Sequence, residues 1–193
     1  MTLHRLSAKL FLKNPVDLDL EAVTAVFHEW IQQSKAPGML IDVADYRHMA
    51  DGPGIVLVGY DVDYAVDLTD GRPGVMHLVK RDLPESIGQC VRMAVHGALV
   101  AADLSEQAGL CKVATAEMQL MFRDRLNTPN DQATFDRLHG DVAEALSQLY
   151  DGAGLAVDRA GSAGRRPLCM NVTAPAAPDL ATLIQRSTAS AGA

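Results

Sequence analysis

Two patterns of apolar and polar residues alternate along this chain. Short apolar runs bounded by Gly, Pro, Asn or Asp are typical of β-strands, and longer segments with apolar residues every three or four positions are typical of α-helices. Strands are predicted at 8–13, 39–44, 54–59, 64–68, 74–80, 111–126, 155–160 and 168–172. The segment 111–126 is either one long strand or two collinear strands. Helices are predicted between Asp19 and Pro37, at 83–108, between Thr128 and Gly152, and at 178–187.

Capping and turn residues mark where these elements begin and end. Asp19, Asp82 and Thr128 are the predicted N-caps of the first three helices, because their side-chain oxygens can accept hydrogen bonds from the free amides of a first helical turn. The sequence TDGRPG at 69–74 separates two apolar runs and predicts a hairpin. The helix at 83–108 is rich in small residues: Gly88, Ala94, Gly97, Ala98, Ala101 and Ala102. Small side chains allow close approach, so we expect this helix to lie centrally against the sheet.

The order strand, helix, strand, strand occurs twice, which suggests an internal duplication. The two halves would be residues 6–80 and 112–172, joined by the helix at 83–108. This alignment places His28 against His139 and Asp42 against Asp158. The alternative is that any two βαββ units resemble one another.

These elements predict an α+β fold. The sheet would be mixed and mostly antiparallel, with about seven or eight strands, three main helices on one side, and two pseudo-repeated βαββ halves. Residues 1–175 would form a single α+β domain, and 176–193 a short helix and a flexible tail. Because ligand sites favour junctions between such halves, a cleft between them is the expected position of a site.

Composition narrows the classes of partner. The chain has 193 residues, 48% of them hydrophobic and 21% charged, which suits one folded domain with a real core. The formal net charge of −7 and the lack of a basic cluster argue against binding nucleic acid or an anionic membrane. The most apolar long segment, 87–104, is interrupted by polar and charged residues, so no membrane span is predicted.

The cysteines and the N-terminal residues indicate in which cellular compartment the protein is expected. Cys90, Cys111 and Cys169 are far apart, odd in number and outside any CxxC motif, which favours reduced thiols in the cytoplasm. The first residues, MTLHRLSAKLFLKN, lack the long apolar core of a signal peptide.

The stretch LIDVADYRHMADGPG, at 40–54, contains the most concentrated chemistry. A carboxylate, a phenol, a guanidinium and an imidazole follow a predicted strand, where functional loops are common. Asp45 and His48 are candidate metal ligands, if a third residue joins them. The candidate ligand-binding residues are Asp42, Asp45, Tyr46, Arg47, His48, His28 and His139. The alternatives are that 45–48 is an ordinary polar loop and that Asp42 caps a local turn.

Two neighbouring patterns are interpreted as structural. Gly52 and Gly54 can take positive φ, so DGPG predicts a tight turn that returns 54–59 antiparallel to 39–44, with Ile55 to Val58 buried on both faces. Residues 39, 41 and 43 would form the apolar face of the preceding strand. Asp61, Asp63 and Asp67 alternate along their strand without the spacing of a calcium loop, so they predict a solvated or edge-protecting strand face.

The motifs GxSxG, HExxH, GxxxxGK[ST] and GxGxxG do not occur in the sequence. The expected function is therefore that of a cytosolic binding or accessory domain that self-associates, as a homo-oligomer, and holds a small ligand between its two halves. The alternative is a metal-assisted enzyme that acts on a small polar substrate through Asp42, Asp45 and His48.

Overall fold

The computed structural model describes residues 3–49, 51–161, 166–176 and 178–191, and within them one antiparallel sheet contains eight strands. The strands are β1 (Leu6–Leu12), β2 (Leu40–Asp45), β3 (Ile55–Gly59), β4 (Val62–Asp67), β5 (Gly74–Val79), β6 (Val113–Phe122), β7 (Ala156–Ala160) and β8 (Leu168–Thr173). The α-helices are α1 (Leu20–Gln33), α2 (Ile87–Gln107), α3 (Gln132–Ser147) and α4 (Leu180–Ala191), and two short 3-10 helices are η1 (Pro15–Asp17) and η2 (Thr69–Gly71). The α+β class is thus confirmed.

The strand order is β2-β3-β4-β5-β1-β6-β8-β7, and each pair of neighbours is antiparallel. The first strand of the chain is therefore central, and all seven of its residues are buried. The predicted mixed sheet is wrong in this respect, because the strands that each helix connects run in the same direction but are not neighbours, and an antiparallel strand always lies between them. The predicted hairpin at 69–74 is confirmed as the connection between β4 and β5.

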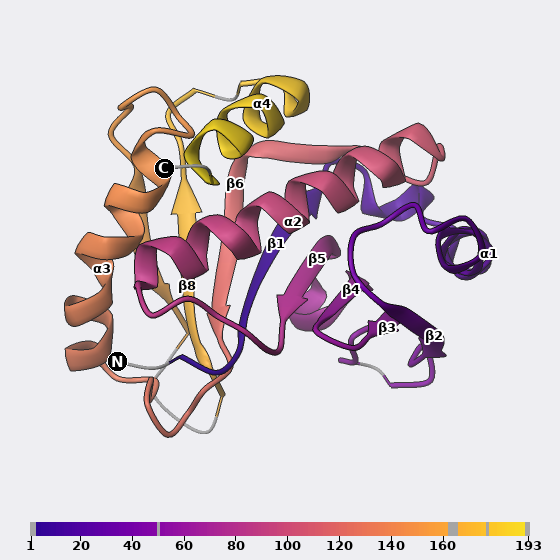
Figure 1. The fold of residues 1–193 in the computed structure, drawn as a ribbon, viewed down its shortest axis with the longest axis horizontal. Helices are drawn as coiled ribbons and strands as arrows, with labels where there is room; N and C mark the ends of the chain where they lie inside the picture. Colours follow the sequence, from indigo (N-terminus) through magenta and orange to yellow (C-terminus); the bar gives the residue numbers. More distant parts are fainter. Residues whose placement is uncertain (1–2, 50, 162–165, 177, 192–193) are drawn as a thin grey trace.

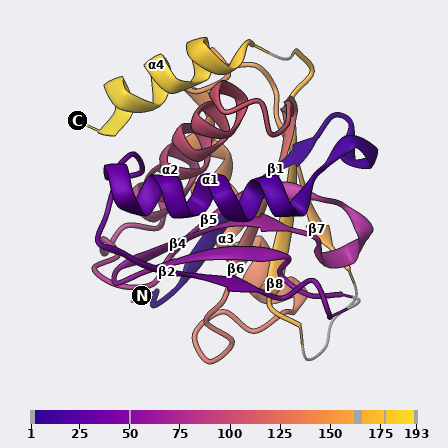
Figure 2. The ribbon, with the colours of Figure 1, turned by 90° about the vertical axis from the view of Figure 1, so that its right-hand side faces the viewer.

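The helices cover one face of the sheet (Figures 1 and 2). α2 packs on β1 and β5 in the centre, α1 on β2 and β3 at one end, and α3 on β7 at the other, while α4 packs on α2. A Cβ added to Gly97 of α2 would overlap the His77 ring on β5, so the small residue allows the close approach that the sequence predicts. An antiparallel sheet can leave its second face open, and here no described helix covers it. We call this second face the helix-free face.

The fourth helix, α4, extends the predicted short helix at 178–187 to Ala191, into the segment predicted to be a flexible tail. The described chain therefore has four α-helices rather than three. In addition, the corresponding strands of the two halves have different neighbours. β8 is adjacent to β6, the first strand of its half, whereas β4 and β5 separate β3 from β1, the first strand of the other half. The internal duplication is accordingly not confirmed.

Two of the three predicted N-caps are wrong. Asp19 caps α1 and accepts hydrogen bonds from two backbone amides. However, Ser86 caps α2, because the chain makes a further turn at Asp82, whose φ is +54°. Asp131 caps α3, because the buried Thr128 hydroxyl instead donates to the Asp124 carbonyl oxygen at 2.6 Å.

The alternation along β2 also differs from the prediction. The register shifts between Leu40 and Asp42, so Ile41 is the extra residue of an irregularity in the ladder. Leu40 and Val43 pack against the core, while Met39 and Ile41 are 66% and 57% exposed. One inserted residue exchanges the two faces of a strand, which is why residues 39, 41 and 43 do not share an apolar face.

The predicted turn between β2 and β3 is confirmed as an antiparallel return, and Gly54 has φ +67°. The predicted burial of β3 on both faces is correct for only one face. Ile55 and Leu57 are buried toward the helices, whereas Val56 and Val58 are half-buried on the helix-free face.

Candidate functional site

The predicted loop residues lie together at the end of edge strand β2, but they bind one another. The Asp45 carboxylate accepts hydrogen bonds from the Arg47 backbone amide at 2.9 Å and from Arg47 Nε at 2.8 Å. The guanidinium of Arg47 holds the pKa of Asp45 below its usual value. Asp42 Oδ1 accepts from the backbone amide of Val43 at 2.8 Å, as in the local capping alternative.

The two rings of this loop lie near each other on the surface. The Tyr46 and His48 rings have centroids 6.4 Å apart, and both residues are exposed. The loop thus presents an exposed pair of rings and a self-contained Asp45–Arg47 ion pair.

The structure separates the two helix histidines that the sequence places in one cleft. His28 is exposed on α1, and His139 packs on Phe135 of α3 with ring centroids 5.3 Å apart. These helices lie at opposite ends of the molecule in Figure 1. Within the described ranges, no three His, Cys, Asp or Glu side chains are grouped closely enough to hold a metal ion.

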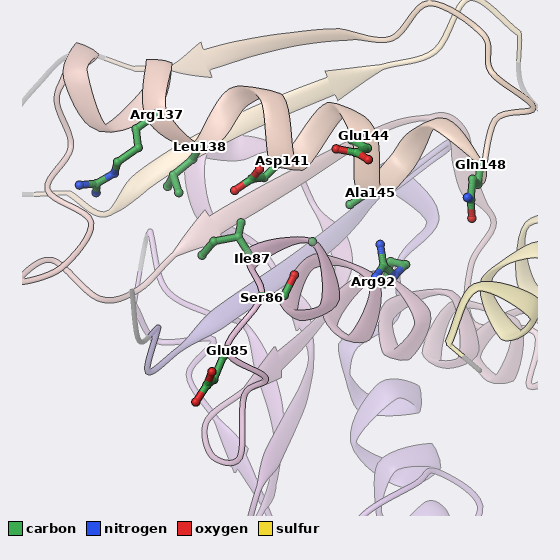
Figure 3. Close-up of a pocket in the computed structure, with 11 residues that line it drawn as sticks. Glu85, Ser86, Ile87, Arg92, Arg137, Leu138, Asp141, Glu144, Ala145 and Gln148 are labelled. Carbon is green, nitrogen blue, oxygen red and sulfur yellow. The ribbon is translucent and has the colours of Figure 1, made fainter. Parts of the chain in front are cut away.

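A hollow lined by charged side chains lies elsewhere, between the beginning of α2 and the second half of α3 (Figure 3). Its volume is about 490 Å³, within the range typical of small-molecule sites. The apolar part of its lining comes from Ile87, Leu138 and Ala145. We call it the α2–α3 hollow.

Charged side chains from both helices face this hollow. Asp141 and Glu144 come from α3, and Arg92 points from α2 toward α3 in Figure 3. None of the three side chains has a hydrogen bond or an ion pair in the part of the chain that the structure describes. Glu85 beside α2 and Arg137 on α3 also line the hollow, so both signs of charge occur on each side, and Arg92, Asp141 and Glu144 do not neutralise one another by direct contact.

A second polar cluster, on the helix-free face, was missed by sequence reasoning. Lys9 of β1 and Asp67 of β4 form an ion pair there, with side chains 4% and 1% exposed. The Thr69 hydroxyl donates to the same Asp67 oxygen at 2.6 Å. Asp67 Oδ1 is buried and accepts no hydrogen bond from the described residues.

Strand β5 lies between Lys9 and Asp67, and Gly74 of this strand leaves room for the lysine side chain to reach across it. Gly74 lies opposite Asp67 on one side and Phe11 on the other. A Cβ at Gly74 would lie 2.8 Å from side-chain carbons of Lys9, so the lysine occupies the space that a side chain would fill. The signal in the sequence was a single lysine within the apolar run of the first strand.

The prediction for the aspartates of β4 is accordingly wrong. β4 is an interior strand between β3 and β5, so it protects no edge. Asp63 forms an ion pair with Lys80 at 2.7 Å, and Asp67 is buried. These carboxylates neutralise lysines within the fold instead of facing solvent.

The cysteines are not activated nucleophiles. Cys90, Cys111 and Cys169 are unpaired. Burial is the main cause that raises the thiol pKa of Cys111 and of Cys169 to about 11, so both remain protonated at neutral pH.

No protein-family model and no curated protein matches this chain. Among the described residues, no helix is long and apolar enough to cross a membrane.

Proposed function

We propose that this protein is a binding protein for a small zwitterionic molecule of amino-acid size, held in the α2–α3 hollow. The observation that carries this proposal is the set of opposite charges without a direct partner in the described chain, Arg92 on one side of the hollow and Asp141 and Glu144 on the other. A ligand with one cationic and one anionic group would complement these charges. The hollow adjoins the joining helix α2, not the predicted junction between two halves.

The hollow is mainly polar, which favours reversible binding of a water-soluble ligand. The small apolar area of Ile87 and Leu138 can contact the carbon skeleton of such a ligand, while the charged groups orient its ends. Charge complementarity gives specificity more than raw affinity, so a dissociation constant of about 1 mM to 10 μM is expected.

The test is a titration of ¹⁵N-labelled protein with free L-amino acids and glycine betaine, followed by backbone amide shifts. We expect saturable shifts at residues 86–88 and 141–145 for at least one zwitterion, and weaker ones for methylammonium or acetate. Asp141→Asn should weaken binding about tenfold, because a charge-assisted contact is lost. The control Asp136→Asn, on the exposed side of the same helix, should bind as the wild type does. Absence of saturable shifts with every zwitterion would contradict the proposal.

A second candidate function is self-association through the β2 edge, which is an outermost strand of the sheet. Met39 and Ile41 present exposed apolar side chains on it, and an unprotected edge strand can pair with a second copy. Sedimentation velocity should then show a dimer at micromolar concentration. Ile41→Lys should shift it to monomer, while the same change at Val16, which is 94% exposed and lies in η1, should not. A wild-type monomer throughout would reject this function.

We also propose that the protein functions in the cytoplasm. The unpaired state of all three cysteines supports this, because reduced thiols are characteristic of that compartment. Labelling of each thiol in freshly lysed cells by a maleimide would test it, and disulfide-protected cysteines would contradict it.

A further inference from the structure

Arg123 has an unusual environment on the helix-free face of the sheet. It directly follows β6, and its backbone amide donates to the Arg5 carbonyl oxygen at 3.0 Å. Its Nε donates to the Ser7 hydroxyl at 3.2 Å, and its Nη2 to the sulfur of Met76 at 3.4 Å. The side chain therefore lies across β1 and β5, with both N–H groups of Nη1 directed at no partner among the described residues.

No carboxylate neutralises this guanidinium by direct contact within the described chain. Other cations of the same face do have such contacts: Lys9 binds Asp67, and Arg72 binds Glu117 at 2.8 Å. Arg123 is half-buried, and burial is the main cause that lowers its pKa. A partly desolvated cation without an acidic partner is energetically costly, so its retention in the fold requires an explanation.

Ion pairs join segments from the two ends of the strand order. Arg166, just before β8, forms ion pairs with Asp70 of η2 and with Asp51, which precedes β3. Strands β3 and β8 are five places apart in the sheet, or roughly 24 Å if the sheet were flat. Arg166 can reach Asp51 and Asp70 only because the sheet curves.

The remaining polar groups nearby are neutral or already paired. Gln119 donates to Asn171 at 3.0 Å, and the Cys169 thiol is protonated at neutral pH. Cross-strand register places Gln119 beside Lys9 on this face. Lys9 has a direct ion pair with Asp67, whereas Arg123 makes no direct ion pair among the described residues.

We propose that Arg123 binds the carboxylate group of a small molecule on the helix-free face, with the Ser7 hydroxyl orienting the guanidinium. A planar guanidinium matches a carboxylate through two parallel hydrogen bonds, and Arg123 has N–H groups without a protein partner that could form them. A phosphate dianion fits less well, because the Asp67 and Asp63 carboxylates lie near the guanidinium and would repel a second negative charge. This site is separated from the α2–α3 hollow by the sheet, so either proposal can fail alone.

The test follows the Nε–H signals of the arginine side chains by ¹⁵N NMR while sodium acetate replaces sodium chloride at constant ionic strength. The Arg123 signal should shift saturably, with an apparent dissociation constant below about 10 mM. The signal of the exposed Arg125 serves as the internal reference and should shift little. Inorganic phosphate at the same ionic strength should produce a smaller shift of the Arg123 signal.

Two variants confirm the assignment through the protein's own signals. Arg123→Gln should weaken acetate binding at least about tenfold, and Arg125→Gln should leave it unchanged. If Arg123→Gln does not fold, the comparison of the Arg123 and Arg125 signals in the wild-type titration decides whether the proposal holds. Equal shifts of Arg123 and Arg125, no saturation with acetate, or stronger binding of phosphate than of acetate would each overturn the proposal.

Discussion

At the scale of single residues, Gly54 shows how a backbone conformation limits the side chain. It has φ +67°, and a Cβ there would overlap the Val66 carbonyl oxygen. Gly54→Val should therefore lower the free energy of unfolding by more than about 1 kcal/mol, measured by urea denaturation. Gly71→Val is the matched control, because φ is +63° and the space around it is open. A loss at Gly54 no larger than that at Gly71 would show that the overlap is relieved without cost.

The buried Lys9–Asp67 pair is a second residue-scale case. Lys9→Met removes the cation but leaves Asp67 buried, so it should lower the free energy of unfolding by about 3–5 kcal/mol. Lys9→Met combined with Asp67→Leu should recover most of that loss, because no buried charge then remains. Urea denaturation of the two variants provides the comparison. An equal loss in both would mean that packing, not charge, explains the effect.

At the scale of elements, the close approach of α2 to the sheet depends on Gly97. Alanine is a better helix former than glycine by up to about 1 kcal/mol, so Gly→Ala normally stabilises an exposed helix. Gly140→Ala, in open space on α3, should raise the melting temperature. Gly97→Ala should lower it, because the new methyl group would overlap the His77 ring. Changes of the same sign in both would mean that α2 can move away from β5 freely.

At the scale of the whole molecule, the buried His77 predicts acid sensitivity. Burial, together with the charge of His96, lowers its pKa to about 4, although its Nδ1 hydrogen bond with the Ala94 carbonyl and the charge of Asp63 act in the opposite direction. The unfolded chain takes up this proton near pH 6.5 and the native chain only near pH 4. Stability contributed by the neutral ring is therefore full above about pH 6.5 and is lost as the pH falls toward 4, by about 3 kcal/mol.

This pH dependence can be assigned to one residue. The difference in unfolding free energy between pH 7 and pH 4.5 should be smaller in His77→Gln than in the wild type, by urea denaturation at each pH. The His77 ring signal in NMR should also titrate with a midpoint near 4. A midpoint near 6.5, or an unchanged pH difference in the variant, would contradict the assignment.

The arrangement of the whole molecule also determines which candidate residues lie close enough to act together. His28 and His139 occupy similar places in the predicted repeat, yet α1 and α3 lie at opposite ends of the molecule (Figure 1). Asp45, Tyr46 and His48 belong to one loop and are close because they are close in the chain, whereas Asp42, Asp45 and His48 do not form a group that could hold a metal ion among the described residues. Proximity along the sequence therefore predicted this cluster, whereas proximity between distant segments could not be predicted without the strand order.

The sequence by itself determined the elements, the hairpin at 69–74, the return at Gly54 and the cap at Asp19, because each depends on interactions within a few residues. It also indicated the α+β class and a helix with small residues against the sheet. Only the tertiary structure decided the irregularity at Ile41, the burial of Asp67 and the half-buried charge of Arg123. These depend on which strands become neighbours, and the order of strands follows from packing the entire chain rather than from any local pattern.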